Sequence, residues 1–171
     1  SGNTVHITSR TGGAITFGGA INDTGSGIIV SNNTAGSTVF NGAVTLNTGA
    51  STAANMTSNT AHAVSFNAGL NATTSSATTL NASGGTLTVL GSANRLTATN
   101  ATAVNLSGVT LGAGGVTFYA VNATGGANGI VLATVTGGTF QVTGDGPSDS
   151  ANTTRGRTTA RQGGGSIALG S

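Results

Sequence analysis

The sequence predicts an all-β fold, a parallel β-helix or β-solenoid with coils of about 22–26 residues. Three observations lead to this prediction: short alternating strands occur along the whole chain, similar segments recur, and charge is almost absent. Asp, Glu, Lys and Arg make up 5% of the residues, whereas glycine occupies 30 positions. Helix is disfavoured because Gly, Thr, Asn and Ser are weak in helix interiors.

Apolar and polar residues alternate in short segments, which is the period of a strand with one buried face. In chain order these segments are residues 14–17, 37–40, 43–46, 63–66, 86–90, 103–106, 115–118 and 138–142. Between them lie GG, NG, NATG, ASGG and TGDG, which are typical of tight turns. The sequence therefore predicts many short strands joined by turns.

Several of these segments resemble one another: AITFGGAI, STVFNGAVTL, AVSFNAGL, AVNLSGVTL and GVTFYAV each contain two short strands around a small or polar break. Phe17, Phe40 and Phe66 recur at intervals of about 23 and 26 positions, and Phe118 and Phe140 at an interval of about 22. This period predicts three-sided coils, about seven in number, with inward Val, Ile, Leu, Phe and Ala forming one continuous core. The register is least defined over residues 67–102, where the Phe marker is missing.

The alternative fold is a β-sandwich, which also has turns roughly every 8–12 residues. Such a domain is expected to bury a Trp or several Tyr, but this chain has no Trp and one Tyr. The glycine content and the internal similarity favour stacked coils.

The predicted organisation has three parts. Residues 1–144 form the solenoid coils, residues 145–165 form a polar loop that contains arginines, and residues 166–171 begin a further solenoid strand. Both ends look cut from a longer parent. No apolar run approaches the roughly 18 residues of a membrane helix, so we expect no membrane insertion.

The units NGAVTLNTGAS, NATGGANGIVLATVTGGTFQVTGDG and GGGSIALGS carry a family resemblance. They resemble the Gly/Asn/Thr-rich repeats of secreted bacterial β-helix proteins, the adhesins of the filamentous-haemagglutinin and autotransporter-passenger type. The resemblance covers most of residues 11–144 and is one of repeat style. It implies a right-handed parallel β-helix, export to the bacterial cell surface, and a role in adhesion or as a stalk.

Candidate catalytic and metal-binding residues are few. Asp145 and Asp149 are near each other in GDGPSDS, where Asp and Gly are expected for turn geometry, and they are the candidates for a calcium site. β-Helix enzymes that cleave pectin display clustered Asp with Lys, Arg or His, and no such cluster is visible here. His6 and His62 are isolated and are expected at the surface or at a corner. We therefore expect no enzyme, no cofactor and no metal.

The best candidate for partner binding is the run NTTRGRTTARQGGGS, which concentrates Arg155, Arg157 and Arg161. These arginines could contact phosphate, sulfated glycans or an acidic surface. No aromatic residue lies between them, so base stacking and nucleic-acid binding are not expected.

Two further patterns discriminate poorly. Thr-x-Thr occurs in TLTV and TAT without an evident fixed coil position, which argues against ice binding. Asn-x-Ser/Thr sequences are frequent in a chain so rich in these residues: Asn22, Asn32, Asn55, Asn71, Asn81, Asn100, Asn105, Asn122 and Asn152.

The functional prediction is a structural or adhesive segment of a secreted bacterial surface protein, a stiff rod or filament that displays loops. Its partners would be a host or neighbouring-cell surface, glycans, or further copies of itself, end to end or laterally. The alternative is a carbohydrate-binding β-helix module in which solvent-facing Asn, Thr and Tyr119 contact sugars in a shallow groove.

Overall fold

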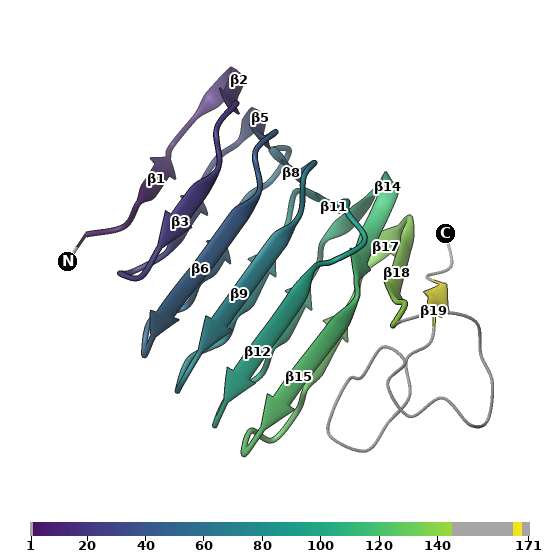
Figure 1. Cartoon of the computed structure of the whole chain (residues 1–171). Helices are drawn as coiled ribbons and strands as arrows, with labels where there is room; N and C mark the ends of the chain where they lie inside the picture. The colour runs from purple at the N-terminus through teal and green to yellow at the C-terminus, as the bar shows by residue number, and fades with distance from the viewer. Residues whose placement is uncertain (1, 145–165, 169–171) are drawn as a thin grey trace.

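The computed structural model describes residues 2–144 and the backbone of residues 166–168. The described chain is all-β, and its strands stack into three sheets that wrap around one apolar core (Figure 1). The described pairings between successive coils are parallel. This confirms the predicted three-sided β-solenoid and rules out the sandwich.

Each sheet takes one side of the solenoid. Sheet A contains β1 (Val5–Thr8), β4 (Ile28–Ser31), β7 (Ala54–Met56), β10 (Leu80–Ser83), β13 (Val104–Ser107) and β16 (Ile130–Ala133). Sheet B contains β2 (Thr11–Phe17), β5 (Ala35–Phe40), β8 (Ala63–Phe66), β11 (Thr86–Val89), β14 (Thr110–Phe118), β17 (Thr136–Gly137), β18 (Thr139–Val142) and β19 (Ser166–Ala168). Sheet C contains β3 (Ile21–Asp23), β6 (Val44–Gly49), β9 (Leu70–Thr74), β12 (Arg95–Thr99) and β15 (Ala120–Thr124).

The chain visits sheets A, B and C in turn, which gives six coils in the described part of the chain and not about seven. The register partners that follow one another through sheet A are Val5, Ile28, Ala54, Leu80, Val104 and Ile130. Their positions give coils of about 23–26 residues, within the predicted range. The register of residues 67–102, left open by the sequence, is set by β9, β10, β11 and β12.

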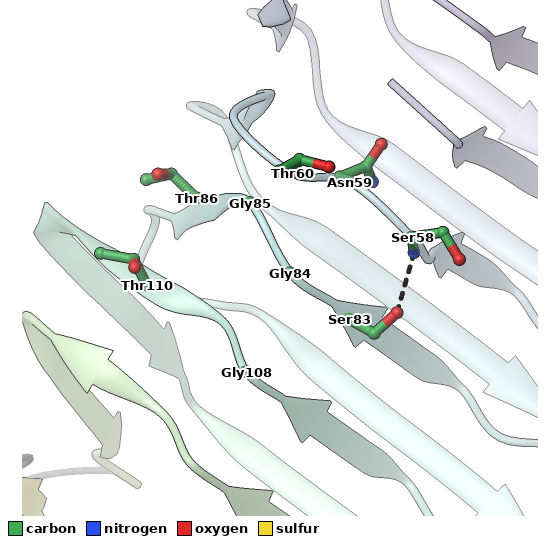
Figure 2. A pocket seen from close by; sticks show the side chains of 9 residues that line it. All are labelled: Ser58, Asn59, Thr60, Ser83, Gly84, Gly85, Thr86, Gly108 and Thr110. Carbon is green, nitrogen blue, oxygen red and sulfur yellow. Dashed lines mark hydrogen bonds between the residues drawn. The ribbon is translucent and has the colours of Figure 1, made fainter. Parts of the chain in front are cut away.

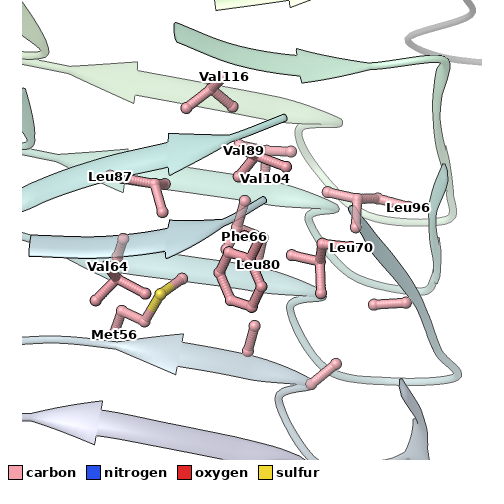
Figure 3. Close-up of a cluster of buried hydrophobic side chains, with 14 of the residues drawn as sticks. Met56, Val64, Phe66, Leu70, Leu80, Leu87, Val89, Leu96, Val104 and Val116 are labelled. Atoms are coloured by element: carbon pink, nitrogen blue, oxygen red, sulfur yellow. The ribbon is translucent and has the colours of Figure 1, made fainter. Parts of the chain in front are cut away.

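Inward-facing apolar side chains form one column that runs through the six described coils. Figure 3 shows the part of this column around Phe66. The Phe17, Phe40 and Phe66 rings stack in this column, with centroids 4.9 and 4.8 Å apart and nearly parallel planes. This separation is the spacing between neighbouring strands, so identical rings at one register position stack without strain. The intervals between these three Phe residues therefore report the coil length correctly.

The second Phe pair does not follow this rule. Phe118 pairs with Val142, and Phe140 pairs with Val116, so the two rings lie two residues apart in register. Their centroids are 6.0 Å apart and their planes are tilted by 52°. The interval between Phe118 and Phe140 therefore underestimates the coil, because the register partner of Phe140 is Val116, and Phe118 lies two residues beyond Val116.

The similar segments noted in the sequence do not all lie at the same corner of the coil. AITFGGAI, STVFNGAVTL, AVSFNAGL and GVTFYAV each span the corner between sheets B and C. AVNLSGVTL instead spans the corner between sheets A and B, because it contains β13 and the beginning of β14. Every corner joins two strands through a short break, so local similarity alone does not show where each coil begins in the sequence.

The corner between sheets A and B has a left-handed residue at the equivalent position of every coil. Its φ values lie between 49° and 67° at Ser9, Asn32, Ser58, Gly84, Gly108 and Thr134. Thr134 is β-branched and disfavours this conformation. Its hydroxyl accepts a hydrogen bond from the Gly108 backbone N–H at 3.1 Å and donates one to the Ala133 carbonyl at 2.7 Å, which offsets the cost.

The last described strand differs from the others. β19 pairs with β18 in the antiparallel direction, with Phe140 opposite Ile167. The outer edge of β18 is therefore occupied by a strand that runs against the direction of the coils.

Candidate functional site

The predicted site residues Arg155, Arg157 and Arg161 lie outside the described residues, and so do Asp145 and Asp149. Their roles stay predictions. Among the described residues, no group of three or more His, Asp or Glu side chains lies close enough together to hold a metal ion. The candidate sites of the described chain lie on the surface of the coils themselves.

His62 lies at a corner, between β7 and β8, which is one of the two places expected from the sequence. Its side chain is buried, which the sequence did not indicate. Its Nε2 is 2.9 Å from the Thr38 hydroxyl and its Nδ1 is 2.8 Å from the Ala35 carbonyl oxygen. Both ring nitrogens are therefore occupied by neighbours in the preceding coil. His6 is exposed on β1.

Two buried asparagines join the second and third coils at the corner between sheets A and B. The Asn59 Oδ1 accepts hydrogen bonds from the Asn33 backbone N–H at 3.2 Å and from the Asn33 side-chain amide at 3.0 Å. The Asn59 amide donates to the Val30 carbonyl at 2.8 Å, and the Asn33 Oδ1 accepts from the Arg10 backbone N–H at 2.9 Å. Asparagine thus supplies the hydrogen bonds that sheet ladders lack at a corner.

The same corner carries a groove of about 450 Å³ across the third, fourth and fifth coils (Figure 2). Residues 57–62 connect β7 to β8, whereas only Gly84 and Gly85 connect β10 to β11, so the fourth coil is recessed. A Cβ atom at Gly84 would lie 2.0 Å from the Asn59 carbonyl oxygen, so no other residue fits there.

Hydroxyl groups and backbone line this groove. Ser58 and Thr60 lie on one side, and Thr86 and Thr110 lie on the other. The Ser58 backbone N–H donates to the Ser83 hydroxyl at 2.8 Å, which ties the floor of the groove to its wall. The lining carries no charged and no aromatic side chain, and it suits a small polar, uncharged ligand.

Sheet C presents a regular polar face, whose strands run side by side at the front of Figure 1. Register places its outward residues in two ranks. The first rank contains Asn22, Thr45, Asn71 and Arg95, and the second contains Asn47, Thr73, Thr97 and Asn122. Apart from Arg95 the ranks are made of hydroxyl and amide side chains. A complete Thr/Asn-x-Thr/Asn pair occurs in β6 and β9, whereas Arg95 and Ala120 interrupt the first rank in β12 and β15.

Arg95 and Tyr119 form one cluster at the edge of this face. The Arg95 guanidinium carbon lies 4.0 Å from the centroid of the Tyr119 ring, a cation–π contact. Arg95 is exposed, and its backbone N–H donates to the Asn71 Oδ1 at 2.9 Å. Arg95 and Tyr119 belong to successive coils, so their contact depends on the stacking of the coils.

Asparagines also form a ladder on the outer face of sheet A. The Asn81 amide donates to the Asn55 Oδ1 at 3.0 Å, and the Asn105 amide donates to the Asn81 Oδ1 at 2.9 Å. All three belong to Asn-x-Ser/Thr sequences. Their register alignment accounts for Asn at these three positions, since stacked amides stabilise neighbouring coils.

Asp23 is the one acidic residue within residues 2–144. Burial raises the pKa of its carboxyl, but hydrogen bonds from Thr4, Gly25 and Gly27 lower it more, and the pKa lies below its usual value. The Thr4 hydroxyl donates at 2.6 Å, and the Gly25 and Gly27 backbone N–H groups donate at 3.0 and 2.6 Å. This carboxylate closes the turn between β3 and β4 and is engaged in structure.

No protein-family model, curated protein or solved structure matches the chain. Within the described residues there is no helix of the length and apolar character needed to cross a membrane. The candidate sites therefore rest on geometry: the hydroxyl-lined groove, the ranks of sheet C, and the Arg95–Tyr119 cluster.

Proposed function

We propose that the chain is a structural segment of a secreted bacterial surface protein, a stiff rod that displays loops and polar faces and takes part in adhesion. The observation that supports this role is the unbroken stack of parallel coils around one apolar column. In such a solenoid each coil is held by its neighbours, so stiffness is a property of the whole stack. The proposal includes no catalytic role, no cofactor and no nucleic-acid partner.

Six coils rise about 24 Å from the first strand to the sixth at the usual strand spacing. A long stalk therefore needs further coils in the same chain or further copies stacked end to end. In the described part of the chain, the outer edges of β1, β2 and β3 have no partner strand. At the other end β19 covers β18, so a second copy that stacks there must displace β19 or pair only with β15 and β16.

Surface display is tested by labelling cells that produce the protein with an antibody raised against the purified chain. Intact cells are expected to be labelled as strongly as permeabilised cells. Labelling that appears only after permeabilisation would contradict export and, with it, a role in adhesion.

Self-association is tested by sedimentation velocity over a wide concentration range, with negative-stain electron microscopy of any large species. If end-to-end stacking belongs to the function, filaments of constant width are expected. A monomer at all concentrations would remove self-association from the proposal and leave the role of a stalk segment.

A second candidate function is carbohydrate binding, which the hydroxyl-lined corner groove favours. Saccharides are recognised through hydrogen bonds to their hydroxyl groups, and Ser and Thr hydroxyls both donate and accept. A glycan array comparing the native chain with a Thr86→Val, Thr110→Val double variant tests this function. Thr16→Val, which removes an exposed hydroxyl from β2 of sheet B in the first coil, away from the groove and from sheet C, is the matched control. Binding that the double variant retains would exclude the groove.

A further inference from the structure

Arg95 is an exposed cation on β12. Residues 2–144 contain two arginines. The guanidinium of the other one, Arg10, donates a hydrogen bond to the Gly12 carbonyl of the following strand at 2.7 Å. Within the described residues, the Arg95 guanidinium contacts the Tyr119 ring and meets no carboxylate or hydrogen-bond acceptor. Its planar set of N–H donors is therefore available to a ligand.

The backbone that carries Arg95 and Tyr119 is held by the corner beneath it. Asn94 is buried, and its amide donates to the carbonyls of Leu90, Gly91 and Thr117 at 2.9, 3.2 and 2.8 Å. The Tyr119 backbone N–H donates to the Asn94 carbonyl at 2.7 Å. Both members of the cluster thus leave the same hydrogen-bonded corner, which lowers the entropy lost when a ligand binds.

The surroundings of Arg95 indicate the chemistry of the ligand. Its neighbours in the two ranks of sheet C are Asn71, Thr73 and Thr97, which offer amide and hydroxyl groups. A guanidinium matches a carboxylate in a two-point contact, and hydroxyl and amide groups match the hydroxyls of a sugar. The site thus combines one anion-binding group with several neutral hydrogen-bonding groups on a flat face.

We propose that Arg95, held against Tyr119, binds the carboxylate of an acidic saccharide that lies along the polar ranks of sheet C. A nucleic acid fits less well, because the site has one positive charge and the face of Tyr119 is occupied by Arg95. A protein partner would need a buried apolar anchor, which these ranks do not contain. The inference deepens the carbohydrate-binding candidate but uses a different surface from the corner groove, and it does not depend on the stalk role.

The test is a titration of the full, isotopically labelled chain with trigalacturonate, followed by amide NMR shifts at low and physiological salt. The neutral trimer maltotriose is the matched probe, and sialyllactose shows whether a terminal sialic acid serves as well as a uronic acid. Trigalacturonate is expected to shift the amides of Arg95, Thr97 and Asn71. Arg95→Gln is expected to weaken binding at least about tenfold, as for loss of a hydrogen bond to a charged group.

Three variants separate the Arg95 contact from the effects of charge alone, test the role of the Tyr119 ring and test the remaining arginines. Arg95→Lys keeps the charge but loses the planar contact, and it is expected to bind more weakly than the native chain. Tyr119→Leu removes the ring against which Arg95 is held and is expected to weaken binding. A chain with Arg155, Arg157 and Arg161 all changed to Gln is expected to bind normally.

Two results obtained with the variants would overturn the inference: trigalacturonate binding unchanged in Arg95→Gln, or binding abolished in the triple variant. Equal binding of maltotriose and trigalacturonate, both sensitive to Thr86→Val, would support the corner groove and exclude the Arg95 site. Changes in amide NMR shifts that are confined to sheet C and are lost in Arg95→Gln would support the Arg95 site, even if the groove binds no neutral saccharide.

Discussion

Replacing Asn59 by alanine tests whether buried side-chain amides hold the coils together at the corner. The Asn59 side chain is 3% exposed and makes three hydrogen bonds. Its removal leaves the backbone N–H and the amide of Asn33 and the carbonyl of Val30 without these partners. A buried polar group that loses its partner costs about 1–3 kcal/mol, so we expect the free energy of unfolding to fall by about 3 kcal/mol.

Asn67→Ala is the matched control. The Asn67 amide donates to the Asn41 Oδ1 at 2.8 Å, but this pair is exposed, and water replaces the lost partner. We expect a loss below about 0.5 kcal/mol. Urea unfolding followed by circular dichroism measures both values, and hydrogen exchange shows whether the second and third coils open first. If Asn59→Ala loses no more stability than Asn67→Ala, the corner amides do not carry the energy assigned to them.

Three further predictions concern stability. Phe66→Ala removes a fully buried ring, and the free energy of unfolding measured by heat or urea is expected to fall by about 3–5 kcal/mol. Phe17→Ala removes the partly buried ring at the end of the same stack, and its loss should be clearly smaller. Gly84→Ala places a methyl group against a carbonyl oxygen at positive φ and should destabilise the chain by more than about 1 kcal/mol, while Gly18→Ala meets open space and should be near neutral. The lowered pKa of Asp23 means that the unfolded chain binds its proton more readily, so this carboxylate stabilises the fold above its ordinary pKa of 3.8. That contribution is lost as the pH falls through the pKa of Asp23 in the folded chain. In Asp23→Asn the free energy of unfolding should therefore fall less steeply at acid pH than in the native chain. An unchanged dependence on acid pH would contradict this.

The sequence predicted sheet B better than sheets A and C. All eight alternating segments overlap strands, but six of them lie in sheet B, one matches β6 of sheet C and one matches β13 of sheet A. The unmatched strands of sheet A have three or four residues, and two of them, β7 and β10, carry Asn at the outward position, which is uncommon in strands. In this fold the Asn is favoured because its amide pairs with an identical amide in the next coil, a benefit that a single strand cannot show.

The corner residues with positive φ also mark the phase of the repeat, that is, where each coil begins in the sequence. The left-handed corner positions, among them Ser9, Asn32, Ser58 and Gly84, follow one another at the same intervals as the coils. Ser, Asn and Gly are ordinary turn residues, so this signal becomes visible only after the coils have been aligned. The bulky Phe marker is clearer, but Val89 and Val116 take its register position in the fourth and fifth coils, and Phe118 lies two residues beyond that position.

The candidate sites were less predictable than the fold. Arg95 and Tyr119 carry no local signal of contact, because they lie one coil apart in the chain and only the stacking of the coils brings them together. The corner groove arises from a difference in loop length between two coils, residues 57–62 against Gly84 and Gly85, which requires the strand boundaries. His62 was expected at the surface or a corner, and its burial follows from the hydrogen bonds that Thr38 and Ala35 offer it.

The stacking of six coils in register is tested most directly by distances between spin labels on one face of sheet A. The chain has no cysteine, so single pairs can be introduced cleanly. Thr8→Cys is combined in turn with Ser83→Cys, Ser107→Cys and Ala133→Cys, which lie in the fourth, fifth and sixth coils. Stacked coils predict separations of about 14, 19 and 24 Å, a constant increment of one strand spacing per coil. Separations that do not increase in equal steps would contradict the parallel solenoid.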